Sequence, residues 1–234
     1  ANVPSICSSQ SDGRTAAGPG SILAGMIDAY RDRDPSGEMW VLPLVDDVTA
    51  VQATGSITFT GPTTALGTLP LYIAGRTVSP IIASGQTAAQ VATTVAAAIN
   101  ATSGLPVTAA VDGAVASKVN LTARNGGECG NDIDIRFAFK GPASQEAMPA
   151  GLAASVAPMA NGAINPVLTT ALSNLLDTPF DFIVCSLTDT VSLAAIVALL
   201  NDATGRWSWS SQVYGHCFIA KRGTAGANAA FATT

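Results

Sequence analysis

Charged side chains are scarce in this 234-residue sequence. Asp, Glu, Lys and Arg together make up 12% of the residues, about half the usual share, while apolar residues make up 48%. Charge-driven intrinsic disorder needs low hydrophobicity and high charge, so this class is excluded. The formal net charge is −5, with only 11 Lys and Arg. This argues against nucleic-acid binding, because phosphate contacts need a surplus of basic side chains.

Histidine is almost absent, and His216 stands alone. A Ser-His-Asp site would have to use it, yet the sequence has no Gly-x-Ser-x-Gly motif. Its neighbour Cys217 would face the other side of a strand, so the two side chains cannot share a zinc ion. We therefore interpret His216 as a strand-end residue with a hydrogen-bonded ring.

Cysteine is also rare, and no pair is spaced as C-x-x-C. Two of the cysteines, Cys185 and Cys217, lie inside apolar runs. We predict buried, reduced thiols in a protein made in a reducing compartment. The four positions are Cys7, Cys129, Cys185 and Cys217.

Long apolar runs are missing as well. The longest uncharged stretch, 77–111, is interrupted by proline, glycine and asparagine, so it lacks the ~20 apolar residues of a membrane span. We expect no membrane insertion. Residues 1–20 are polar and contain no signal-peptide core. The sequence lacks an initiating Met, and residues 223–234 begin like a helix and then stop, so we expect a fragment.

Four short segments resemble ligand sites but are better explained as turns and strand entries. Asp132 and Asp134 share a strand face that could bind a hard cation, but they follow a turn-rich segment. The glycines of 223–229 lack dinucleotide spacing, and those of 18–21 lack a phosphate-loop lysine. The same interpretation applies to Asp46-Asp47. The sequence therefore predicts no catalytic residue, no cofactor-binding residue and no metal ligand.

The first block, 1–53, has a helical pattern followed by a strand. Ile22, Leu23, Met26, Ile27 and Tyr30 recur at helical spacing, which predicts a helix over 20–32. The run at 39–42 then predicts a buried strand.

The middle block, 54–158, changes to a period of two. Alternating apolar residues predict half-buried, mostly antiparallel strands near 57–59, 69–73, 107–111, 119–123, 133–139 and 152–156. One helix interrupts them: Thr87 and Gln90 form a capping-box pattern, and Val91, Val95 and Ile99 follow as an apolar stripe. We predict a compact β-rich α+β module.

The third block, 159–234, returns to helical spacing. Asn165-Pro166 predicts a helix start with proline at the first helical position. Two buried strands, 182–185 and 216–220, flank a helix that is capped by Asp189 or Thr190 and ended by Gly205. Strand, helix and strand in this order predict a βαβ unit with a parallel sheet. We therefore expect one discontinuous α/β domain, 1–53 plus 159–234, mostly parallel and truncated at its C-terminus, interrupted by the inserted β-rich module 54–158.

An ordered series of short motifs carries a family resemblance over nearly the whole chain. The series is Gly18-Pro19-Gly20-Ser21, Trp40–Leu44, Leu71–Arg76, Ala97–Ala101, Leu105–Ala109, Leu121–Arg124, Gly127–Asp134, Pro149–Leu152, Asn165-Pro166 and Gly215–Thr224. In this order the motifs resemble the tail sheath protein of Mu-like contractile-tailed bacteriophages. Members of that family are longer at both ends, with an N-terminal arm and a C-terminal domain that exchange strands with neighbours.

The resemblance implies a structural role. Sheath subunits form a helical homopolymer around the tail tube protein, contact baseplate and tail terminator proteins, and contract to drive the tube through the host envelope for genome ejection. It implies assembly in the bacterial cytoplasm, a place in the virion, and an outward position for 54–158. Two alternatives stay open at this point: a carbohydrate- or receptor-binding module on the β-rich block, and a nucleotide-dependent enzyme.

Overall fold

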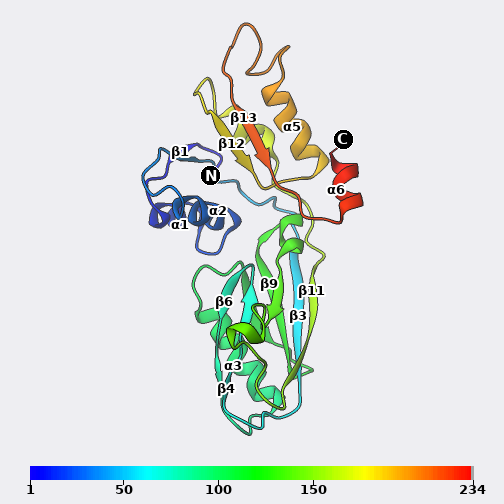
Figure 1. The fold of residues 1–234 in the computed structure, drawn as a ribbon. Helices are drawn as coiled ribbons and strands as arrows, with labels where there is room; N and C mark the ends of the chain where they lie inside the picture. The colour runs from blue at the N-terminus through cyan, green and yellow to red at the C-terminus, as the bar shows by residue number, and fades with distance from the viewer. Residues whose placement is uncertain (233–234) are drawn as a thin grey trace. The chain divides into compact units, whose positions relative to one another are not determined.

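The structure is a computed structural model that describes residues 1–232. The chain divides into two compact units, each built from separate stretches of sequence (Figure 1). Unit 1 comprises Ala1–Ile6, Met39–Asp47 and Asn165–Thr234, and unit 2 comprises Cys7–Glu38 and Val48–Ile164. Each sheet lies wholly within one unit.

A four-stranded antiparallel sheet in the order β11-β3-β9-β8 forms the centre of unit 2 (Figure 1). Its strands are β3 (Gln52–Thr60), β8 (Val107–Val111), β9 (Lys118–Gly126) and β11 (Ala153–Ala160). The period of two in the sequence explains one buried face: Ile57 and Phe59 are at most 1% exposed, while Thr60 next to them is exposed. The alternation predicted for these strands is confirmed.

Helix α3 (Ala88–Ala101) packs on the buried face of this sheet. Its capping box is present, with the Thr87 side chain accepting from the Gln90 N–H and the Gln90 side chain accepting from the Thr87 N–H. Val91, Val95 and Ile99 are fully buried, as their spacing predicts. Together with the sheet they form the main hydrophobic core.

Shorter elements complete the β-rich part of unit 2. They are β4 (Gly67–Thr68), β5 (Leu71–Ile73), β6 (Arg76–Val78), β7 (Ile81–Ile82), η1 (Glu128–Asp132), β10 (Ile135–Phe137) and η2 (Pro142–Ser144). The strand predicted over 133–139 is shorter than expected, because η1 ends at Asp132 directly before it and Ala138, with a φ of 46°, follows the last residue of β10. Ile133, Ile135 and Phe137 still pack against the core, whereas Phe139 is 60% exposed.

Two short helices, α1 (Gln10–Ala17) and α2 (Ile22–Arg31), belong to unit 2. The nearly buried Asp28 of α2 accepts hydrogen bonds from Arg14 of α1 at 3.2 Å and from Arg76 of β6 at 2.5 Å. The Ile22 N–H donates to the Asn125 side chain. These contacts explain why residues 7–38 group with the β-rich block, whereas we expected them in the α/β domain.

Unit 1 contains two small sheets and three helices. Its elements are β1 (Ser5–Ile6), β2 (Trp40–Val41), α4 (Leu168–Ser173), β12 (Phe182–Cys185), α5 (Thr190–Leu200), β13 (His216–Ile219) and α6 (Ala225–Phe231). Strands β12 and β13 pair in parallel, with α5 between them in sequence. Strands β1 and β2 pair antiparallel. A mostly parallel α/β domain with an insertion remains a prediction, because this parallel pairing involves two strands.

Two helix boundaries differ from their sequence signals. Helix α4 begins at Leu168 rather than at Pro166, and its N-cap residue Val167 offers no side-chain acceptor. Helix α5 begins after Asp189, as predicted, but ends at Leu200 instead of continuing toward Gly205. The Asn201 side chain ends it, because its oxygen accepts from the N–H groups of residues 203–205 and closes a turn there.

Candidate subunit contact surface

The residues that the sequence suggested as ligand sites are divided between the two units, with His216 in unit 1 and Asp132 and Asp134 in unit 2. His216 is the first residue of β13, and its exposed ring lies 6.3 Å from the ring of Trp207. Asp132 ends η1, and Asp134 forms an ion pair with Arg136 at 2.5 Å. Within residues 1–232, no cluster of three or more His, Cys, Asp or Glu could hold a metal ion.

The two glycine-rich segments each lead into a helix cap. Ser21 caps α2 by accepting from the Ala24 N–H. Gly20 before it has a φ of 84° and lies against the carbonyl oxygen of Leu105. Thr224 caps the short helix α6 by accepting from the Ala227 N–H. Each segment therefore supplies the N-cap residue of the helix that follows it. This structural role requires no bound ligand.

The most distinctive surface of unit 1 is one face of the β12–β13 pair, which we call the strand face. It consists of Phe182, Val184, His216 and Phe218, because Phe182 pairs with His216 and Val184 with Phe218 in register. Phe182 is 71% exposed, Val184 63% and Phe218 55%. The rings of Phe182 and Phe218 lie 5.9 Å apart. Three large apolar side chains thus project from one face of this strand pair and are more than half exposed.

This exposure corrects the prediction that 182–185 and 216–220 are buried strands. Only the opposite face, with Cys185 and Cys217, is half-buried. Burial raises the pKa of Cys217 to about 11 and raises the pKa of Cys185 as well, so both thiols are protonated near neutral pH. Sequence periodicity missed the exposed face, because a fully apolar run does not show which side lacks a cover.

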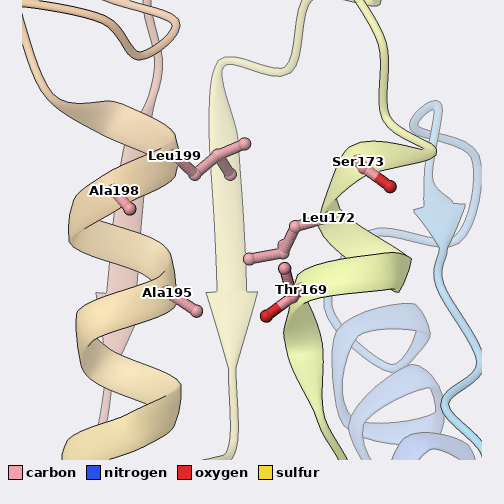
Figure 2. A pocket seen from close by; sticks show the side chains of 6 residues that line it. All are labelled: Thr169, Leu172, Ser173, Ala195, Ala198 and Leu199. Carbon is pink, nitrogen blue, oxygen red and sulfur yellow. The ribbon is translucent and has the colours of Figure 1, made fainter.

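A shallow apolar groove lies between α4 and α5 (Figure 2). Its volume is about 250 Å³, and it is lined by Thr169, Leu172, Ser173, Ala195, Ala198 and Leu199. Figure 2 shows Leu172 and Leu199 projecting into the space between the two helices. The lining contains two hydroxyl groups and no titratable side chain, so the groove offers packing and no acid–base chemistry.

The loop after α5 carries further exposed aromatic side chains. Trp209 is 84% exposed and Tyr214 is 63% exposed. The loop is anchored by the nearly buried Arg206, whose guanidinium donates to the carbonyl oxygens of Leu176, at 2.6 Å, and Thr178. Exposed aromatic and aliphatic side chains that lie close together in this way are typical of protein–protein contact surfaces.

The Mu-like prophage FluMu tail sheath protein of Haemophilus influenzae is 38% identical over 217 residues, which is 93% of this chain. The chain is homologous to a stretch of a phage tail sheath protein. The resemblance found in the sequence motifs is therefore confirmed. No family model matches the chain.

The tail sheath relative is much longer than this chain. The aligned stretch covers 43% of its length, so the chain spans less than half of the sheath protein that it matches. In residues 1–232, no helix is long and apolar enough to cross a membrane. The homology concerns a protein named for a structural part of the tail, and the apolar surfaces of unit 1 are of the kind that contact other proteins.

Proposed function

We propose that the intact protein is a structural subunit of a contractile phage tail sheath. The observation that carries the proposal is the 38% identity over 217 residues to a prophage tail sheath protein. The proposed partners are further copies of the same protein in a helical polymer, the tail tube protein, and the baseplate and terminator proteins at the two ends. Nucleic acid and lipid are not among the proposed partners. The proposed location is the tail of the virion, after assembly in the bacterial cytoplasm.

Helical assembly and contraction impose two physical requirements. A helical polymer needs heterologous contacts that repeat from head to tail, so each subunit must carry two different complementary surfaces. Contraction needs two packings of the same subunit that differ in free energy. The low charge of the chain, the exposed Trp209 and Tyr214, and the groove between α4 and α5 support the first requirement. We further propose that the β-rich block lies on the outside of the sheath.

The proposed role is not enzymatic. The conspicuous apolar surfaces lack paired acid and base groups, and the lining of the groove between α4 and α5 has no titratable residue. A glycan-binding role is also not favoured. The outward face of the four-stranded sheet carries Thr, Ser, Asn, Ala and Lys118, and it offers no aromatic ring on which a sugar could stack.

Electron microscopy of the full-length protein tests the proposal. Purified full-length protein is expected to form long, regularly striated tubes of uniform diameter, and co-expressed tube protein is expected to lie inside them. The 234-residue chain serves as the control. A full-length protein that remains a monomer at all concentrations, with and without tube protein, contradicts the sheath role.

A further inference from the structure

The strand face of unit 1 requires a cover that residues 1–232 do not provide. Parallel strands occur almost only in sheets that are covered on both faces, and an isolated pair of strands is marginally stable. On one side, the side chains of β12 and β13 are half-buried. On the other side, Phe182, Val184 and Phe218 remain more than half exposed.

The size of the strand face decides whether its cover is a second copy of the protein or another segment of the same chain. A buried aromatic side chain contributes about 150–250 Å², so the three partly exposed side chains present roughly 300–400 Å². A stable interface between separate proteins buries about 800 Å² on each partner. The strand face is therefore too small to hold a free second subunit. A covalently connected segment needs no such area, because its effective concentration is in the millimolar range.

We propose that an amphipathic helix from a part of the intact protein outside residues 1–234 packs on the strand face. The relative supports this, since 43% of its length corresponds to this chain and the remainder lies outside the aligned stretch. A helix is the expected cover, because helices occupy both faces of parallel sheets in α/β domains. Its apolar stripe contacts the Phe182 and Phe218 rings and the Val184 side chain. The proposal does not depend on the sheath function.

Cysteine labelling in the full-length protein tests this packing. Val184→Cys places a thiol in the centre of the strand face, and Phe182→Cys gives a second position. Thr108→Cys, on the exposed side of β8 in unit 2, is the matched control. Maleimide labelling rates are measured site by site with mass spectrometry, in the 234-residue chain and in the full-length protein. Sedimentation over a concentration series reports the assembly state of each sample.

The expected result is a labelling rate at 184 and 182 that falls at least about tenfold in the full-length protein and is independent of concentration. The rate at 108 should stay within about twofold. Equal rates at 184 in both proteins would overturn the proposal. Protection that develops only as subunits assemble would also overturn it, because a neighbouring copy would then be the cover. The labelling result can be interpreted even if electron microscopy shows no tubes. A failure of this proposal can therefore be distinguished from a failure of the proposed sheath function.

Discussion

At the scale of single residues, Asp112 shows how a few polar contacts hold a turn of the β-rich block. Its carboxylate accepts from the Asn120 side chain and from the N–H groups of Ala114 and Val115, and it lies 3.5 Å from the Lys118 ammonium. The hydrogen bond from Asn120 and the two backbone bonds hold the pKa of Asp112 well below its usual value. The turn between β8 and β9 is thereby fixed.

This pKa shift predicts a pH-dependent effect of Asp112→Ala. A carboxyl group with a lowered pKa in the folded state contributes stability above its unfolded pKa of about 4, and this contribution is lost as the pH falls further. The loss of stability caused by Asp112→Ala should therefore be full at pH 7 and shrink below pH 4. Urea unfolding of both proteins from pH 3 to pH 7 measures it. A difference that stays constant over this range would contradict the role of the carboxylate.

Two glycines before α2 offer a matched comparison of strain and space. Gly18 and Gly20 have similar positive φ values of 79° and 84°, but a Cβ on Gly18 would meet open space. A Cβ on Gly20 would clash with the Leu105 carbonyl oxygen and the Arg124 side chain. Gly18→Ala should cost about 1–3 kcal/mol from backbone strain alone, and Gly20→Ala should cost clearly more. Equal losses of stability in thermal unfolding would show that the Leu105 carbonyl group can move away from residue 20 at little energetic cost.

At the scale of elements, α3 is the best-defined helix because its local signals and its packing agree. The capping box satisfies N–H groups at its start, and its apolar stripe is fully buried. Thr87→Ala should destabilise unit 2 by about 1 kcal/mol, because it leaves a helix N–H without its acceptor. Thr93→Ala, in the exposed middle of the same helix, is the control and should be neutral or slightly stabilising. Chemical denaturation followed by circular dichroism distinguishes the two variants.

At the scale of the whole chain, the segments between the two units are the expected sites of proteolysis. Residues 42–49 form no helix or strand, and Val45 and Val48 are 56% and 100% exposed. Exposed segments of this kind are cut first by proteases. Brief digestion with a broad-specificity protease should cut within 42–51, before β3 begins, or within unit 2 in the connection 141–150, and mass spectrometry identifies the ends. Initial cleavage inside β3 or α3 would be inconsistent with this organisation.

The association state of the 234-residue chain follows from the size of its apolar surfaces. The strand face presents less area than a stable interface needs. We therefore expect a monomer at micromolar concentration, where the full-length protein forms tubes. Sedimentation velocity at several concentrations measures this. A stable hexamer or a long tube made from residues 1–234 would show that the surfaces of this chain suffice to hold a sheath together.

Local structure was largely predictable from the sequence. The capping box of α3, the alternating strands β3, β8 and β9, and the Asp189 cap of α5 depend on residues within a few positions of each other. These short-range signals depend on backbone geometry and on side chains that are close in sequence. They can therefore be recognised from one sequence alone. The Pro166 signal was wrong, because proline at that position precedes the helix without starting it.

The sequence by itself determined helix α3, strands β3, β8 and β9 with their apolar faces, and the resemblance to a tail sheath protein. Tertiary structure decided which elements belong together. The ion pair between Asp28 and Arg76 joins residues 48 positions apart and contributes to placing α2 in the β-rich unit. It also decided that Phe182 and Phe218 are exposed. The physical reason is that burial depends on what covers a face, and contacts between distant residues leave no periodic trace in the sequence.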